Sequence, residues 1–396
     1  MANVSSSNGL EKRPKLRFPG FDEPWKVFKA EELFQNVTDK NHPDETVLTI
    51  IQGKGTLPRE QAGRNIHYDD ASLSNYKKVE QGDFIIHLRS FEGGLEMANE
   101  AGIVSPAYTI LRCKRPHSSL FYDAYFHTDE FINHNLSKSV EGIRDGRQIS
   151  YEAFKWLGIP YCEPTEQEQI SSLFSVLNER IAKQRNLVES LKKYKRGVSD
   201  YLFLQNSKMP IHCKWKQFSF GDVVEINPKT PPLPEQFIYI DLECVESGQL
   251  KSLNYINKNH APSRAQRVLC RNDVLFQMVR PYQKNNYLYK DIFDVPVVAS
   301  TGYAQIRCSE CNPFFVYEQI SSEQFSREAM MRSTGTGYPA INADGLAQIP
   351  FYVPTPEEQE KIGVFLSALG AKIAKESEIL AALDIIKKAL MQQLFT

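Results

Sequence analysis

The feature that most constrains this chain is a long segment that occurs twice. Residues 164–203 align with residues 356–395 without a gap, at an offset of 192 positions. Fourteen of the 40 aligned positions are identical, whereas average composition would give about two or three by chance. Both copies begin with Pro-x-Glu-Gln-x-x-Ile and end in Leu-Phe. The chain is therefore expected to be a tandem repeat.

The repeat extends beyond this segment, because shorter runs upstream match in the same order. "WKVF" at 25–28 corresponds to "WKQF" at 215–218, and "YTILRC" at 108–113 corresponds to "YAQIRC" at 303–308. Runs such as "DFIIHLR" and "DVLFQMV" are rich in strand-forming residues, and Gly and Pro separate them. A chain of 396 residues is long enough for two or three domains. The sequence predicts an α+β fold with two similar mixed α/β blocks, at residues 15–162 and 213–353.

Each block is followed by a predicted long helix, at residues 163–204 and 354–396. Apolar residues recur at the spacing of one helical face, and no proline interrupts 165–204. Thr355 is a candidate cap, Pro356 suits a first turn and Glu358 completes a capping box, while the first helix is capped by Glu163 or Thr165. The residues expected to pack along the helices are Ile170, Leu173, Leu177, Ile181, Leu191, Ile362, Phe365, Leu369, Ile373 and Leu383.

An apolar stripe of this length needs a partner, since 40 helical residues reach about 60 Å. The other copy is the partner that the sequence offers, which predicts two antiparallel helices forming a coiled-coil-like spacer with pseudo-two-fold symmetry. The alternative is that each helix packs only on its own block. Residues 205–212 are expected to be a hinge and residues 1–14 a flexible tail.

Composition excludes several classes of protein. No apolar run approaches the roughly 18–20 residues of a membrane helix, and the N-terminus lacks the apolar core of a secretory signal, so a cytoplasmic location is expected. The seven cysteines include one lone C-x-x-C, Cys308 and Cys311, without the second ligand pair that zinc requires. We therefore expect reduced thiols and no metal. The net charge of −1 argues against indiscriminate coating of nucleic acid but permits a local basic groove.

The sequence contains none of the common catalytic motifs: no phosphate-binding P-loop, dinucleotide fingerprint, zinc-protease motif, hydrolase elbow or adenine-methyltransferase motif. This pattern favours a binding protein over an enzyme. The candidate binding residues are basic or aromatic and lie in Gly- and Pro-rich loops, where arginine can contact guanine or phosphate. In the first block they are Lys54, Arg59, Arg64, Arg89, Arg144 and Arg147, and in the second Arg264, Arg267, Arg280, Tyr282, Lys284, Arg332 and Tyr338.

Taken together, these motifs resemble the specificity subunit of a bacterial type I restriction–modification enzyme. The resemblance is carried by "PKLRFPGF" near the N-terminus, the two Pro-x-Glu-Gln-x-x-Ile helix starts and the Leu-Phe helix ends. The block endings "GRQISYEAFKWLGIP" and "GTGYPAINADGLAQIP" belong to it as well, so that it covers nearly the whole chain.

The resemblance implies two target-recognition domains, residues 15–162 and 213–353, each reading one half of a split double-stranded DNA site. It also implies that the helices fix the gap between the half-sites and dock two methyltransferase subunits. The chain itself would be non-catalytic, with S-adenosylmethionine on the methyltransferase partner and ATP and Mg on the restriction subunits. The loops at 142–149 and 335–341 would face DNA, and their different sequences imply different half-sites.

Two other functions are compatible with the residues alone. One is an enzyme with a fused nuclease or methyltransferase activity, which the missing motifs oppose. The other is a helical-rod scaffold or oligomerisation protein without sequence-specific DNA binding.

Overall fold

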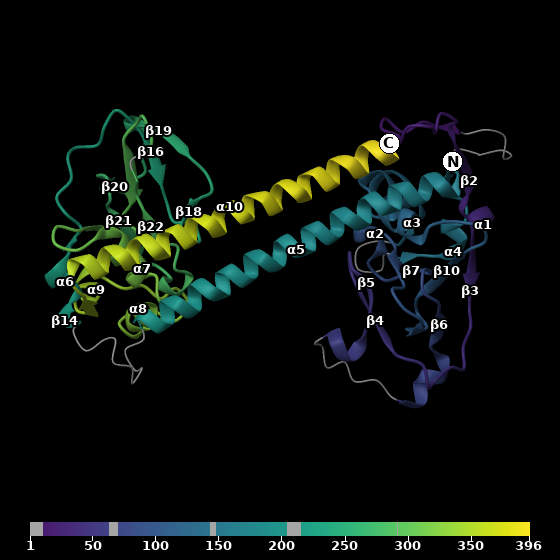
Figure 1. Ribbon diagram of the computed structural model, residues 1–396, viewed down its shortest axis with the longest axis horizontal. Helices are drawn as coiled ribbons and strands as arrows, with labels where there is room; N and C mark the ends of the chain where they lie inside the picture. Colours follow the sequence, from purple (N-terminus) through teal and green to yellow (C-terminus); the bar gives the residue numbers. More distant parts are fainter. Residues whose placement is uncertain (1–10, 63–69, 143–147, 204–214, 291) are drawn as a thin grey trace. The chain divides into compact units, whose positions relative to one another are not determined.

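A computed structural model describes residues 11–62, 70–142, 148–203, 215–290 and 292–396 (Figure 1). Its contacts divide the chain into two units: unit 1 is residues 1–184 with 379–396, and unit 2 is residues 185–378. Helices α5 (Pro164–Phe203) and α10 (Pro356–Phe395) each contribute residues to both units. The predicted α+β class, with two mixed domains and two long helices, is confirmed.

Unit 1 is built on a four-stranded sheet of order β3-β10-β7-β8, with helices packed against it. Smaller sheets join β1 and β13 to β2, β4 to β5, β6 to β9, and β11 to β12. The strands are β1 (Glu11–Lys12), β2 (Trp25–Lys29), β3 (Phe34–Val37), β4 (Leu48–Ile51), β5 (Gly55–Pro58), β6 (Lys77–Val79), β7 (Phe84–Ile86), β8 (Glu96–Met97), β9 (Gly102–Val104), β10 (Thr109–Cys113), β11 (Val140–Glu141), β12 (Gln148–Ile149) and β13 (Gly158–Tyr161). The short helices are α1 (Ala30–Leu33), α2 (Ser90–Gly93), α3 (Ser119–Phe126), α4 (Tyr151–Phe154), η1 (Arg59–Ala62), η2 (Asp70–Asn75), η3 (Glu130–Asn135) and η4 (Leu136–Ser139).

Unit 2 contains the equivalent sheet, in the order β15-β24-β21-β22, and a second four-stranded sheet of order β19-β16-β23-β20. Two pairs, β14 with β25 and β17 with β18, complete it. The strands are β14 (Lys216–Ser219), β15 (Glu225–Ile226), β16 (Gln236–Ile240), β17 (Val245–Glu246), β18 (Gln249–Leu250), β19 (Asn254–Asn257), β20 (Ala265–Val268), β21 (Val274–Gln277), β22 (Tyr287–Leu288), β23 (Val297–Ser300), β24 (Tyr303–Arg307) and β25 (Pro350–Val353). The short helices are α6 (Phe220–Val223), α7 (Pro313–Ile320), α8 (Glu323–Met331), α9 (Ala343–Ala347), η7 (Lys258–His260) and η8 (Pro281–Gln283).

Each unit contains an Asp–Arg ion pair of its own, at the same place in the equivalent sheets. In unit 1, Arg112 on β10 donates from Nε and Nη2 to the two carboxylate oxygens of Asp83, at 2.9 and 2.7 Å. In unit 2, Arg307 on β24 makes the same two bonds to Asp273, at 2.9 and 2.8 Å. Both aspartates are almost fully buried, so each pair is a fixed, two-point link between neighbouring strands. The repeat seen in the sequence is therefore a repeat of internal structure.

The repeated Glu-Gln at each helix start forms the same contacts in both units. Gln167 donates to the carbonyl of Cys162 at 2.8 Å and accepts from the backbone N–H of Ser118, which precedes α3. Gln359 repeats both contacts, donating to the carbonyl of Pro354 and accepting from the N–H of Asn312, which precedes α7. Each buried glutamine thus fastens the start of a long helix to a short helix of the same unit, because buried amides need such partners.

The glutamate of the motif has a role that the sequence did not reveal. Trp25 Nε1 donates to Glu166 at 2.9 Å, and Trp215 Nε1 donates to Glu358 at 3.1 Å. The predicted capping box at Glu358 is wrong, since none of the described hydrogen bonds joins its carboxylate to the Thr355 N–H. The cap left open for the first helix is Glu163, whose carbonyl accepts from the N–H groups of Glu166 and Gln167.

The Leu-Phe pair that ends each helix closes a hydrophobic core. In unit 1, Phe395 is fully buried, with ring centroids 5.2 Å from Phe121 and 6.1 Å from Trp25. In unit 2, Phe203 occupies the equivalent place, 6.0 Å from Phe315 and 6.3 Å from Trp215. Phe395 comes from the second repeat and Phe203 from the first, so each core is completed by the other repeat.

Most residues predicted to pack along the helices are buried or half-buried: Ile170, Leu173, Leu177, Ile181, Leu191, Ile362, Leu369, Ile373 and Leu383. Phe365 is an error, because its side chain is 48% exposed while the next residue, Leu366, is fully buried in the unit 2 core. Adjacent helical residues point about 100° apart, so a shift of one position moves the apolar face. The alternative in which each helix packs only on its own block is excluded by the burial of Phe203 and Phe395.

Two predicted flexible segments fall partly or wholly outside the described residues. The hinge at 205–212 lies there entirely, as do residues 1–10 of the expected tail. The next two residues of that tail, Glu11 and Lys12, form β1 and pair with β2, which the sequence did not indicate. None of the helices in the described part of the chain is long and apolar enough to cross a membrane.

Candidate nucleic-acid interface

In unit 2, a loop following β21 is held rigid by a buried glutamine. The Gln277 side chain is 2% exposed and donates to the carbonyl of Val279 and to Gln283 Oε1, both at 2.8 Å. Its own oxygen accepts from the N–H of Asn285 at 3.1 Å. One side chain therefore fixes both ends of the turn that contains η8, which sets the direction of the residues at its tip.

Arg280 starts this turn in a strained conformation. Its φ of 54° and ψ of 59° lie in the left-handed region, which side chains other than glycine adopt at an energetic cost. Its N–H donates to the carbonyl of Pro339 at 2.7 Å, and its guanidinium carbon lies 4.3 Å from the ring centroid of Tyr338. No ion pair joins Arg280 to another described residue, so its charge is available for a ligand.

The loop at 335–341 joins the β21 turn to form one surface. Val279 bridges Ala340, and the N–H of Ile341 donates to the carbonyl of Met278 at 3.0 Å. Two tyrosines of the combined loops are exposed, Tyr282 by 51% and Tyr338 by 70%. We call Arg280, Tyr282 and Tyr338 the unit 2 loop surface. An arginine stacked on an exposed tyrosine is suited to hydrogen bonding and stacking with nucleic-acid bases.

Two other predicted cations of this region are already neutralised. Lys284 pairs with Glu323 at 2.5 Å, and Arg332 pairs with Glu328 at 2.5 Å on the same helix. The Lys284 ammonium, hydrogen bonded to Glu323, lowers the pKa of that carboxyl, which keeps the partner charged. These residues are therefore weaker candidates for phosphate contact than Arg280.

The remaining predicted pair of unit 2 lies on a different sheet. Arg264 precedes β20 and is exposed, whereas Arg267 lies within β20 and is half-buried. Burial lowers the pKa of Arg267, and no described residue forms an ion pair with either arginine. The sequence grouped them with Arg280, but the structure places Arg267 on β20, the edge strand of the β19-β16-β23-β20 sheet, and Arg264 immediately before it.

In unit 1, Lys54 and Arg89 lie on neighbouring turns. Lys54 is at the exposed turn between β4 and β5, and Arg89 is exposed immediately before α2. The turns approach closely, because a Cβ on Gly93 of α2 would lie 2.0 Å from the side-chain nitrogen of Gln52. Arg59, by contrast, is half-buried and donates to Thr49 Oγ1 at 3.4 Å.

A buried carboxylate holds the Lys54 turn in place. Glu96 accepts from the N–H groups of Gly53 at 2.6 Å and Gly55 at 2.9 Å, and its Oε1 lies 3.3 Å from His127 Nε2. Burial alone would raise the pKa of Glu96, but the bonds from His127 and the two glycines outweigh it and lower the pKa. Burial would lower the pKa of His127, yet Glu96 and Asp123 raise it to about 9.

Three predicted arginines cannot be placed. Arg64, Arg144 and Arg147 lie outside the described residues. The last two belong to the predicted DNA-facing loop at 142–149, of which the structure describes Gly142 and β12; Gln148 of β12 pairs with Glu141 of β11, which precedes the loop.

Sequence reasoning missed the residues that orient these loops. Gln277 and Glu96 are polar residues in or beside β-rich runs, and both are buried. A polar side chain interrupting an apolar strand is the signal that would have found them, since a buried polar group implies a hydrogen-bond network. Tyr255 on β19, 69% exposed, is a further aromatic that was overlooked.

The described residues provide no metal site. No group of three or more His, Cys, Asp or Glu is arranged to hold a metal within them. Cys308 and Cys311 are free, and burial, with the Cys311 thiol nearby, raises the pKa of Cys308 to about 12. A thiol with so high a pKa is a weak nucleophile near neutral pH.

Comparisons with known proteins show what the chain resembles. Residues 213–384 match the model of the type I restriction modification DNA specificity domain. The type I restriction enzyme MjaVIII specificity subunit of Methanocaldococcus jannaschii is 21% identical over 410 aligned residues, covering 96% of this chain and 93% of that protein. The chain is therefore similar over nearly its whole length to a specificity subunit of a type I restriction enzyme, and its second half matches the type I DNA specificity domain. The resemblance that the repeat motifs carry is thereby confirmed.

Other specificity subunits are similar over part or all of the chain. The HindI specificity subunit of Haemophilus influenzae is 25% identical over 195 residues, which is 46% of this chain and 40% of that protein. The solved S subunit from M. genitalium shares the fold, with a TM-score of 0.62 and 14% identity over 97% of this chain and 99% of that chain. A chain from a type I R-M system solved for its complex assembly has a TM-score of 0.52 at 16% identity, over 96% of this chain and 98% of that chain. The match to the DNA specificity domain supports DNA recognition over the rod-scaffold alternative.

Proposed function

We propose that each unit of this specificity subunit reads one half of a bipartite DNA site, with target-recognition domains at residues 15–162 and 213–353. The observation that carries the proposal is that a shared frame bears unlike loops. The sheet order and the Asp–Arg pairs are common to both units, whereas the loops that emerge from them differ in length and charge. A constant frame with variable loops is the arrangement expected of a DNA-reading protein. The frame positions the protein on the DNA, and the loops determine which bases are recognised.

In unit 2, Arg280 is the residue proposed to read a base, with Tyr282 and Tyr338 contacting bases or sugars beside it. A guanidinium presents two parallel N–H donors, which match O6 and N7 of guanine in the major groove. Packing on Tyr338 and anchoring through Pro339 restrict the guanidinium before binding, so less conformational entropy is lost. In unit 1, Lys54, Arg89 and the 142–149 loop are proposed to take the same part.

We further propose that the chain is non-catalytic and acts in the cytoplasm with partners. Two methyltransferase subunits dock on the long helices and supply S-adenosylmethionine, and restriction subunits supply ATP-dependent cleavage with Mg. The length of the helices sets the number of base pairs between the half-sites, because a helix rises 1.5 Å per residue.

The test is methylome sequencing of cells that carry altered versions of the subunit with its partners. Replacing residues 15–162 by the corresponding block of a relative should change one half-site only. Inserting four residues within 178–200 should change the spacing and leave both half-sites intact, and four substitutions at exposed positions of the same segment serve as the control. Altered half-sites at unchanged spacing, or two altered half-sites after the single-block exchange, would contradict the proposal.

A further inference from the structure

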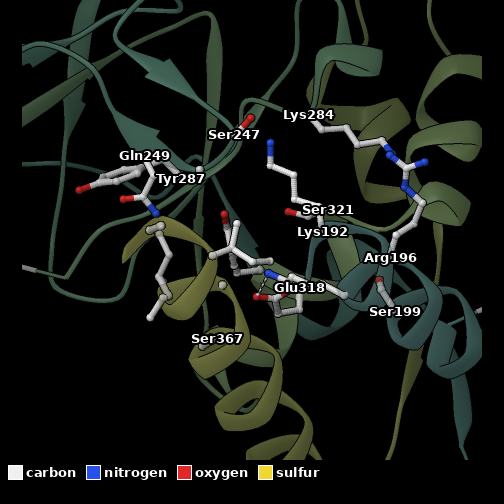
Figure 2. A pocket seen from close by; sticks show the side chains of 18 of the residues that line it. Lys192, Arg196, Ser199, Ser247, Gln249, Lys284, Tyr287, Glu318, Ser321 and Ser367 are labelled. Carbon is white, nitrogen blue, oxygen red and sulfur yellow. Dashed lines mark hydrogen bonds and ion pairs between the residues drawn. The ribbon is translucent and has the colours of Figure 1, made fainter. Parts of the chain in front are cut away.

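Unit 2 contains a cavity that DNA reading does not use. It has a volume of about 820 Å³ and is enclosed by α5, α10, the β17–β18 turn, β22 and the region where α7 meets α8 (Figure 2). All of its lining residues belong to unit 2. Pockets of about 300–1,000 Å³ are the size that holds small-molecule ligands.

The lining of the cavity is basic. Six cationic side chains line it against four carboxylates, Asp200, Glu318, Glu323 and Glu378, an excess of two positive charges in a chain whose net charge is −1. The cations come from α5, α10 and the segment that runs from η8 past β22, and they are Lys192, Lys195, Arg196, Lys284, Lys290 and Lys375.

Two of these cations serve the structure of the cavity wall. Lys195 bonds to Glu318 at 2.9 Å, and burial raises the pKa of Glu318, with Lys195 opposing the shift. Lys195 reaches α10 at a glycine, since a Cβ on Gly370 would lie 3.1 Å from its Nζ. Lys284 pairs with Glu323. These contacts account for two of the four carboxylates, Glu318 and Glu323.

Of the other four cations, Lys192 pairs with Glu189 on the same helix at 3.2 Å. Arg196, Lys290 and Lys375 form no ion pair with any described residue, and all three are exposed. The guanidinium of Arg196 and the side chain of Lys284 extend toward one another at one side of the cavity (Figure 2). Like charges converge at a cost unless an anion sits between them, and Glu323 interacts with both.

Another part of the wall is uncharged. Leu288, Ile373, Ala371 and Ala374 provide an apolar surface, and Ser247 and Ser321 add hydroxyl groups. A ligand that fits both parts has an anionic end and a compact, uncharged, hydrogen-bonding body.

From this combination we propose that the cavity binds a phosphorylated small molecule of nucleotide size, its phosphates meeting Arg196 and Lys375. This site is separate from the unit 2 loop surface, and the inference does not depend on how DNA is read. Its failure would leave the half-site proposal untouched.

The test is isothermal titration of the full chain with ATP, and separately with tripolyphosphate, in buffer without divalent cations. The cavity variant is Arg196→Gln with Lys375→Gln, and the matched control is Arg185→Gln with Lys361→Gln, which removes two exposed cations of the same helices outside the cavity. The wild type should bind ATP at least as tightly as tripolyphosphate. The cavity variant should bind about tenfold more weakly and the control within about twofold of the wild type, because each charge–phosphate contact at an exposed site is worth under about 1 kcal/mol.

Four outcomes would overturn the proposal. These are no binding of ATP by the wild type at millimolar concentration, equal loss in both variants, binding of tripolyphosphate alone, and preferential binding of an oligoglutamate peptide or duplex DNA that competes with ATP. Thermal unfolding of each variant shows whether the fold is retained, which is expected because all four substituted side chains are exposed.

Discussion

The two glutamates at the helix starts offer an internal comparison, because the same residue has different partners in the two units. Glu166 is 1% exposed and accepts from Trp25, at 2.9 Å, and from Arg17 Nε and Nη2, at 2.9 and 2.8 Å. Glu358 is half-buried and accepts from Trp215 alone among the described side chains. We predict that Glu166→Gln destabilises unit 1 more than Glu358→Gln destabilises unit 2.

The magnitude follows from what each substitution leaves behind. Breaking a buried ion pair costs about 3–5 kcal/mol, and the cost at Glu166 should be lower, about 2–3 kcal/mol, because the Arg17 side chain remains 16% exposed and can be hydrated. At Glu358, glutamine retains an oxygen that accepts from the indole, so the loss is about 1 kcal/mol or less. The expected difference is therefore about 1–2 kcal/mol.

The assay is urea unfolding monitored by hydrogen exchange. The two units need not unfold together, and a single unfolding midpoint would not separate their stabilities. Exchange should rise at 158–170 in Glu166→Gln and only slightly at 350–362 in Glu358→Gln. Arg17→Ala is the companion variant, which should lower the stability of unit 1 and change nothing in unit 2. Equal destabilisation of the two units, or a larger effect of Glu358→Gln, would refute the reasoning.

Three further predictions follow from the same contacts. Because the pKa of His127 is raised from 6.5 to about 9, its pairing with Glu96 stabilises unit 1 fully below pH 6.5, and this stabilisation, no more than about 3 kcal/mol, is lost as the pH rises through 9. Hydrogen exchange at the β4–β5 turn, corrected for intrinsic rates, should increase over this pH range in the wild type. The same pH-dependent increase in His127→Gln would disprove the prediction. Arg280→Gln should weaken binding of the assembled enzyme to its target DNA by about 1–3 kcal/mol and relax one base of one half-site, while Arg332→Gln, which removes an already paired charge, should have a small effect; equal effects would count against the loop surface. Phe395→Ala should cost unit 1 about 3–5 kcal/mol, and hydrogen exchange that rises equally in unit 2 would show that the core assignment is mistaken.

The parts of the fold that could be predicted from the sequence are those in which apolar residues recur at a regular spacing over a long segment. Both 40-residue helices were placed within two residues of their bounds, because apolar spacing and capping residues define them locally. The prediction that Phe365 packs was wrong, because the sequence pattern does not show which of two adjacent apolar residues, Phe365 or Leu366, faces the core. Glu358 was predicted to complete a capping box, whereas the contacts of the Glu-Gln motif lie 47–49 and 141–143 residues away in sequence.

The binding loops were harder, because charge alone does not say what a side chain faces. Arg280 and Lys284 are four residues apart and looked equivalent, yet one stacks on Tyr338 and the other pairs with Glu323. The difference depends on left-handed backbone at both positions and on the Gln277 hydrogen bonds, neither of which has a local sequence signature. The same reason explains the difference in exposure within unit 1, where Arg59 is half-buried and Lys54 and Arg89 are exposed.

Each long helix ends in the core of the other repeat, and this has a consequence for a chain that contains only one repeat. A protein truncated after residue 203 would keep Trp25 and Phe121 but lose Phe395, the ring that packs on both of them. It would still carry Phe203, the ring that does the same work beside Trp215 and Phe315. In a pair of such half-length proteins, Phe203 of each could take the place of Phe395 in the core of the other. Under the proposed function, two identical halves would match a palindromic target.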